Sequence, residues 1–142
     1  MEERKDKQTE GNSLILIPKM EKYVEYVLCM LLKIPRTEKY SIGNEYKLSM
    51  YKMLENTMFL NKISIRSQEV KQKQYTMVNK EMYLEHLNKI DTLLNCQRIY
   101  LRIMDKNHWI DQKKFYISME YTYEIGKILG GLFKYYAKNN PK

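Results

Sequence analysis

Residues 83–104, YLEHLNKIDTLLNCQRIYLRIM, carry the most regular apolar pattern in the chain. The large apolar residues of this stretch recur at steps of three, four or seven positions, a spacing that puts them on one face of an α-helix. They are Tyr83, Leu87, Ile90, Leu94, Leu101 and Met104. The polar residues Gln97 and Arg98 interrupt the stripe where a turn is skipped. The pattern predicts a helix over 78–104 that buries one face.

Three other segments show the same periodicity and predict helices from Pro18 to about 34, over 39–65 and over 111–137. Proline is favoured in the first helical turn, and Asp111 is a suitable N-cap for the last helix. The expected inward faces are Met20, Val24, Val27, Leu31 and Ile34 in the first; Leu48, Tyr51, Leu54 and Met58 in the second, with Tyr46, Met50 and Met53 beside them; and Ile117, Tyr121, Ile125, Ile128 and Leu132 in the last, with Phe115, Leu129 and Phe133 alongside.

Breaks between these segments are few, because the chain holds only five glycines and three prolines. The polar, aperiodic stretch 66–76, RSQEVKQKQYT, is expected to form a loop or a poorly supported extension of a helix. Gly43 predicts a close backbone approach, and Gly126 with Gly130, four residues apart, predicts a helix face that another helix can approach closely. Short connections favour an all-α, antiparallel up-down-up-down four-helix bundle. Residues 1–17 are expected to be a flexible N-terminal tail and residues 18–138 the bundle domain.

The positive charge belongs to the predicted bundle. The formal net charge is +8, whereas the first 18 residues hold four acidic and three basic residues. Residues 61–80 hold five bases and one acid, and residues 106–142 hold seven bases and three acids. Such an excess favours polyanionic partners through phosphate neutralisation, although a lysine-rich composition can also be incidental.

Catalytic and metal-binding patterns are absent from the sequence. His86 and His108 fit no metal-ligand spacing with each other or with the cysteines, and no phosphate-binding glycine loop, GxSxG or CxxC motif occurs. His86 is expected at a solvent boundary and His108 at the end of a helix. Cys29 and Cys96 are interpreted as small buried residues in a reducing compartment. We therefore expect no enzyme activity, no metal and no cofactor.

The apolar runs are too short for a membrane span, which needs about 20 residues, and the segment LILI is too short for a signal peptide. The expected location is the cytoplasm. Met30, Met50, Met53 and Met82 lie off the main stripes, so the surface is expected to hold apolar area that self-association would bury.

Arg98 and Arg102 stand four residues apart in the 78–104 helix, and Lys106 continues the row. This row fits either phosphate contacts or an ion pair between subunits. Neighbouring tyrosines could stack on bases or complete the core and its interfaces. They are Tyr100, Tyr116, Tyr123, Tyr135 and Tyr136.

Two motifs resemble those of a known family of small four-helix bundles. Residues 34–46, IPRTEKYSIGNEY, match its P-R-x-x-(K/R)-Y-x-(I/L)-G signature through Pro35, Arg36, Tyr40 and Gly43. Residues 121–136, YTYEIGKILGGLFKYY, match its I-G-(K/R)-x-(I/L)-G-G segment. The family comprises the accessory variability determinant proteins of diversity-generating retroelements and related proteins encoded in bacterial 23S ribosomal RNA intervening sequences. The resemblance spans residues 18–136; the polar tail and the 66–76 segment depart from it.

The resemblance implies a homopentameric barrel of four-helix bundles with a basic surface. In the retroelements, it implies an accessory protein that binds a reverse transcriptase and nucleic acid during mutagenic cDNA synthesis. The leading hypothesis is therefore a non-enzymatic accessory protein that binds RNA or DNA, and the alternative is a structural or interaction protein without a nucleic-acid ligand. The candidate nucleic-acid contacts are Arg66, Lys71, Lys73, Arg98, Arg102, Lys113, Lys114, Lys127 and Lys134.

Overall fold

The computed structural model describes the backbone of residues 2–69 and 73–138 and the side chains of residues 15–63 and 80–136. Within this part of the chain, the regular structure is entirely helical. The helices are α1 (Glu2–Leu31), α2 (Arg36–Lys39), α3 (Ile42–Glu69), α4 (Lys73–Lys106) and α5 (Gln112–Lys138). The all-α prediction is thus confirmed.

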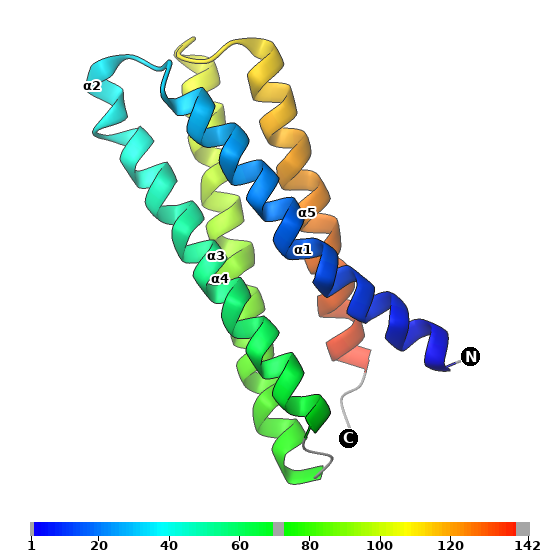
Figure 1. The fold of residues 1–142 in the computed structure, drawn as a ribbon. Helices are drawn as coiled ribbons and strands as arrows, with labels where there is room; N and C mark the ends of the chain where they lie inside the picture. Colours follow the sequence, from blue (N-terminus) through cyan, green and yellow to red (C-terminus); the bar gives the residue numbers. More distant parts are fainter. Residues whose placement is uncertain (1, 70–72, 139–142) are drawn as a thin grey trace.

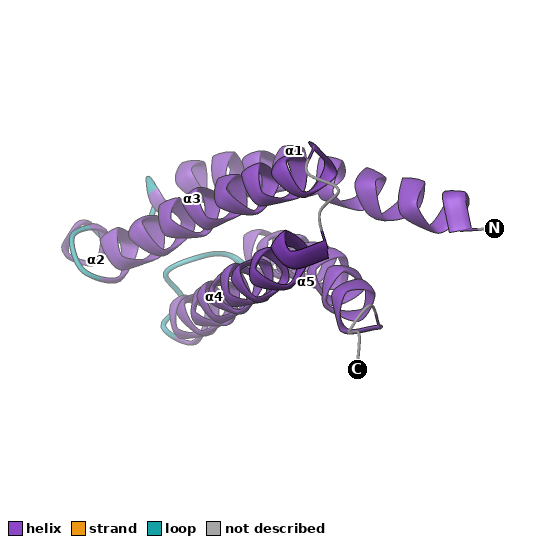
Figure 2. Cartoon of the chain, turned by 90° about the horizontal axis from the view of Figure 1, so that it is seen from below, coloured by secondary structure: helices purple, strands orange, loops and turns teal. Residues whose placement is uncertain are grey.

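The four long helices run antiparallel to their neighbours in the chain, and the short α2 turns the chain from α1 into α3 (Figure 1). Helix α1 packs mainly against α5, α3 packs mainly against α4, and α4 also packs against α5. The view from below shows these helices around one shared core (Figure 2). The chain therefore forms the up-down-up-down bundle that the sequence predicts.

Two predicted helix boundaries are wrong. Helix α1 begins at Glu2 and contains Pro18, and its N-terminal part extends away from the bundle (Figure 1). A proline inside a helix removes one hydrogen bond, but the segment before it is rich in good helix formers. The helix predicted over 39–65 continues to Glu69, and residues 73–76 are helical as well. The stretch 66–76 therefore follows the helix-extension alternative and not the loop, because Gln, Glu, Lys and Arg also support helices. The flexibility of residues 1–17 stays a prediction.

The predicted inward faces of α1 and α4 are confirmed. All six stripe residues of α4 are at most 3% exposed, and those of the first predicted helix are at most 6% exposed. Helix α5 follows its prediction in part: Ile125 and Leu132 are buried, whereas Ile117, Tyr121 and Ile128 are half-buried. Its buried face also includes Met119, Thr122 and Leu129.

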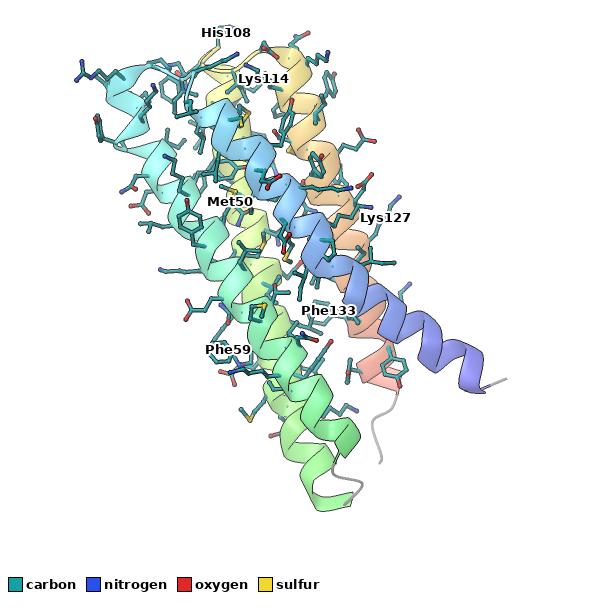
Figure 3. The ribbon with its side chains drawn as sticks, viewed as in Figure 1. Met50, Phe59, His108, Lys114, Lys127 and Phe133 are labelled. Carbon is teal, nitrogen blue, oxygen red and sulfur yellow. The ribbon has the colours of Figure 1, made fainter. Side chains whose placement is uncertain are left out.

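The predicted inward face of α3 is wrong. Leu48, Tyr51 and Met58 are between 45% and 51% exposed. The buried residues of α3 are Tyr46, Met50, Met53, Thr57 and Leu60, and Met50 lies inside the bundle in Figure 3. Thr57 made this stripe look polar in the sequence. Its hydroxyl donates to the Met53 carbonyl at 2.8 Å, which permits its burial.

A buried polar network links α1, α3 and α4. The Tyr23 hydroxyl donates to Gln97 Oε1 at 2.8 Å and lies 2.7 Å from the Tyr46 hydroxyl, which therefore donates to it. Gln97 Nε2 donates to Ser49 Oγ at 3.1 Å. Gln97, expected as a polar interruption of the α4 stripe, is instead completely buried because each polar end of its amide has a partner.

The turn between α4 and α5 has specific capping at both ends. His108, at the end of the bundle in Figure 3, has φ 58° and donates its backbone N–H to the Asp105 carbonyl. The Trp109 N–H donates to the Met104 carbonyl, which completes a Schellman motif. Asp111 Oδ1 accepts the Lys114 N–H at 2.8 Å, so the predicted N-cap is confirmed.

The cysteine and methionine expectations need correction. Cys29 is exposed and Cys96 is half-buried, so neither thiol is a fully buried core residue. Met30, Met50 and Met53 are buried, whereas Met82 is 45% exposed. Much of the apolar excess assigned to the surface is therefore in the core. The surface apolar area comes instead mainly from the outer side of α3 and from parts of α1 and α4.

Candidate nucleic-acid interface

Arg98 crosses from α4 to α5. Its Nε donates to Thr122 Oγ1 at 3.2 Å and its Nη2 donates to the Thr122 carbonyl at 2.9 Å. A third donor, Nη1, lies 2.8 Å from Asn95 Oδ1. The guanidinium also sits 5.3 Å from the centroid of the Tyr123 ring, a cation–π distance. Arg98 is thus held by its own chain and has little freedom to follow a phosphate backbone.

Gly126 makes this position possible. A Cβ at Gly126 would lie 2.7 Å from Arg98 Nη2, closer than a real side chain allows. Gly130 differs, because among the described residues no atom other than those of its chain neighbours and its own helix backbone lies within 4 Å of its ideal Cβ position. The predicted close approach along the glycines of α5 is thus real at Gly126, where the neighbour is a side chain, and is absent at Gly130 within the described chain. At Gly43 the predicted backbone approach is confirmed, with the Glu38 carbonyl oxygen 3.2 Å away.

The outer face of α5 carries exposed basic and aromatic side chains. They follow one another at steps of three, four or seven residues and so share one side of the helix. They are Lys113, Tyr116, Tyr123, Lys127 and Lys134. Tyr116 is 69% exposed and Tyr123 is 57% exposed, and Lys127 extends away from the bundle in Figure 3.

Arg102 and Lys106 are exposed on α4, the helix beside α5. Among the described residues, neither forms an ion pair, and the same is true of Lys113, Lys127 and Lys134. Glu120 is the acidic residue on the same exposed side of α5. We refer to Arg102, Lys106, Lys113, Tyr116, Tyr123, Lys127 and Lys134 as the α4/α5 face. Its lysines and arginine are free to neutralise phosphates.

The remaining predicted contacts do not join this face. Lys114 is half-buried and lies 3.7 Å from Asp111 Oδ2. Arg66 and Lys73 belong to the end of α3 and the start of α4, at the opposite end of the bundle from His108 (Figure 1), and their side chains fall outside the described residues. Lys71 also lies outside the described residues.

Two tyrosines considered for base stacking belong to the core instead. Tyr136 stacks on Tyr83 with ring centroids 4.0 Å apart, and Tyr100 packs near Tyr46 at 5.9 Å. Burial raises the pKa of Tyr83 and Tyr136, as it does for Tyr23 and Tyr46. The largest pKa shifts therefore belong to the packed interior and not to the α4/α5 face.

A second polar surface lies on the outer side of α3 and α4, and sequence reasoning missed it. It is a groove of about 470 Å³ lined by Lys52, Asn56, Glu85, Asn88, Lys89, Thr92 and Leu93. The sequence signal was present, since Lys52 and Asn56 stand one turn apart, but the pairing of these two helices was needed to bring Lys89 opposite them.

His86, expected at a solvent boundary, is half-buried there. Its Nδ1 lies 2.9 Å from Asn56 Oδ1, and its ring stacks on Phe59 with centroids 5.4 Å apart. In the part of the chain that the structure describes, no three His, Cys, Asp or Glu residues come together as metal ligands. None of the described helices has the length and apolarity needed to cross a membrane.

The fold and the α4/α5 face define a four-helix bundle with a basic, tyrosine-bearing surface. Comparison with known families gives a match over residues 14–136 to the family described as bAvd-like. The match covers most of the chain, so the protein belongs to the bAvd-like family, a family of accessory proteins. This confirms the resemblance seen in the two motifs. No curated protein and no solved structure matches the chain significantly.

Proposed function

We propose that the protein is a non-enzymatic, cytoplasmic accessory protein of a diversity-generating retroelement that binds RNA or DNA together with a reverse transcriptase. Membership of the bAvd-like family supports an accessory role. The observation that carries nucleic-acid binding is the α4/α5 face, which holds two exposed tyrosines and five basic side chains without an ion pair among the described residues. Lysines and arginines contact phosphates, and tyrosine rings provide stacking surfaces for unpaired bases.

Self-association is part of this proposal. Large apolar side chains that are at least 40% exposed occur on α3 and α4 and in the turn after α1; they include Leu32, Leu48, Tyr51, Ile99 and Ile103. Exposed apolar area of this kind favours burial between subunits. A homopentamer would repeat the α4/α5 face around the assembly and add weak phosphate contacts together. Light scattering on the purified protein tests this: a mass of about five protomers supports the pentamer and a monomer contradicts it.

Fluorescence anisotropy with a labelled single-stranded oligonucleotide tests nucleic-acid binding. The logarithm of affinity should fall linearly with the logarithm of salt concentration, by about 0.7 per phosphate contact. Arg102→Glu with Lys127→Glu should weaken binding and flatten this slope. Lys22→Glu with Lys33→Glu is the matched control, because both lysines are exposed on the α1 side of the bundle. Equal effects of the two pairs would argue for net charge alone instead of the α4/α5 face.

One observation favours the alternative of a structural protein without a nucleic-acid ligand. Arg98, the first residue of the predicted basic row, donates its hydrogen bonds to Thr122 and Asn95. If this alternative holds, the wild-type protein changes the electrophoretic mobility of neither RNA nor DNA at moderate salt. Co-purification with a reverse transcriptase encoded beside the gene, tested with the full chain, separates a partner-dependent accessory role from this alternative.

A further inference from the structure

The α3/α4 groove offers positive charge on both of its walls. Lys52 on α3 is exposed and forms no ion pair among the described residues, and Lys89 stands on α4. Lys89 Nζ lies 3.8 Å from Glu85 Oε1, and both side chains are more than half exposed. Such a long, exposed pair is weak, so Lys89 can exchange the carboxylate for a phosphate at little cost.

The floor and sides of the groove carry amide and hydroxyl groups. Asn56 is fixed, because its Nδ2 donates to the Lys52 carbonyl at 2.9 Å while its Oδ1 lies 2.9 Å from His86 Nδ1. The Asn88 carboxamide has no hydrogen-bond partner among the described residues. A free amide of this kind can pair with the edge of a nucleobase or with a sugar hydroxyl.

An aromatic platform adjoins the groove. Phe59 follows Asn56 by one helical turn, is 46% exposed, and stacks on His86 with an interplanar angle of 18°. His86 covers one side of the Phe59 ring, and Asn56 holds the His86 ring in place. Phe59 lies at the outer edge of the bundle in Figure 3, so the rest of its ring is open to solvent. Lys52 and Phe59 are seven residues apart, or about 10 Å along the helix.

We propose that the α3/α4 groove binds one nucleotide of a single-stranded nucleic acid, with its base stacked on Phe59 and its phosphate between Lys52 and Lys89. The groove volume lies within the range of about 300–1,000 Å³ that small-ligand sites occupy. The proposal rests on the proposed nucleic-acid function and adds a second contact surface to it. Stacking on Phe59 favours unpaired bases, as stacking on the tyrosines of the α4/α5 face does, and adds a further position at which a base is held.

The test uses the full-length protein and an oligonucleotide that contains 2-aminopurine, whose fluorescence is quenched on stacking. Wild-type protein should quench it. Phe59→Ala should reduce the quenching to the part that the exposed tyrosines of the α4/α5 face contribute, and should weaken binding by about 5- to 150-fold, as expected for the loss of one stacked base. Phe59→Trp keeps an aromatic ring at this position, so it should retain both the quenching and the affinity of the wild type. Met58→Ala is the matched control, since Met58 is the neighbouring exposed residue and does not line the groove.

Lys52→Ala and Lys89→Ala test whether these two lysines contact the phosphate of the bound nucleotide. Each should lower the salt slope by about 0.7, the value for one single-strand phosphate contact, and leave the quenching in place. Every variant is checked for an unchanged oligomeric state by light scattering. If Phe59→Ala binds and quenches as the wild type does, the groove proposal is overturned while the proposed function stands.

A second probe separates the two proposals. Saturation-transfer NMR with adenosine 5′-monophosphate should show transfer to the adenine protons that Phe59→Ala removes. If the oligonucleotide does not bind but this transfer occurs, the proposed function fails and the groove stands as a mononucleotide site. If neither probe binds the wild type, both proposals are overturned.

Discussion

The Arg98 guanidinium occupies the space that a side chain at Gly126 would need, with Nη2 2.7 Å from the ideal Cβ position. The same guanidinium donates to the side chain and the carbonyl of Thr122, one turn earlier on α5. Gly126 and Arg98 therefore form one unit that joins α4 to α5. The sequence predicted that the backbone of another helix would approach Gly126. In the structure the Arg98 side chain occupies that position instead.

This relationship predicts opposite effects for two glycines of the same helix. Gly130→Ala should stabilise the protein by up to about 1 kcal/mol, because alanine favours the helix and the added methyl meets no atom. Gly126→Ala gains the same propensity but displaces Arg98, whose charged hydrogen bonds are worth about 1.5–3 kcal/mol each. We expect a net loss of about 1 kcal/mol, measured by urea unfolding of both variants. A Gly126→Ala protein as stable as Gly130→Ala would show that Arg98 moves aside freely.

The sequence predicted those parts of the fold in which apolar spacing had one solution. In α4 only one face carries large apolar residues at regular steps, so Leu87, Ile90 and Leu94 were placed correctly. In α3 two faces are apolar, and the longer run through Leu48 and Tyr51 looked stronger than the buried one, which Thr57 interrupts. Periodicity alone cannot choose between two such faces, because the choice depends on what the neighbouring helices present.

The candidate site was predictable only in part, for a related reason. Basic residues of α5 such as Lys127 and Lys134 lie opposite its buried stripe, so their exposure follows from spacing. Arg98 lies at the edge of its helix, where a partner helix decides its role, and Thr122 is not visible as that partner in the sequence. The α3/α4 groove depends in the same way on the register between two helices.

The buried tyrosines provide a second prediction. Tyr23→Phe and Tyr46→Phe each remove one hydroxyl from a fully buried ring. Only the first deprives Gln97 of its donor and Tyr46 of its acceptor, whereas the second leaves the Tyr23–Gln97 hydrogen bond intact. Tyr23→Phe should therefore cost about 1–3 kcal/mol, the penalty of unsatisfied buried polar groups, and Tyr46→Phe about 1 kcal/mol or less. Equal losses in denaturant unfolding would contradict this order of donors.

The same residues predict alkaline instability. Burial raises the pKa of Tyr23, Tyr46 and Tyr83 above the unfolded value of about 10. Above that pH the unfolded chain releases tyrosine protons while the folded chain retains them, so the unfolding free energy decreases as pH rises. Each such tyrosine contributes a slope of about 1.4 kcal/mol per pH unit.

Urea unfolding between pH 8 and 11.5 measures this slope. Below pH 9 these tyrosines are protonated in both the folded and the unfolded chain. Their titration should therefore not change the unfolding free energy in that range. Tyr83→Phe should make the decrease of the unfolding free energy with pH shallower by about 1.4 kcal/mol per pH unit, the contribution of one buried tyrosine. A slope that Tyr83→Phe does not alter would mean that its hydroxyl titrates normally in the folded state.

The turn after α4 gives the last prediction. His108 holds φ at 58°, a left-handed conformation in which a Cβ costs about 1–2 kcal/mol, and the Schellman hydrogen bonds around it are all made by backbone groups. His108→Gly and His108→Ala both delete the imidazole, but only glycine lacks the Cβ. The glycine variant should therefore be more stable than the alanine variant by about 1 kcal/mol, the reverse of their order inside a helix. Urea unfolding midpoints of the two variants decide the matter, because an alanine variant of equal or greater stability would require a negative φ at this position.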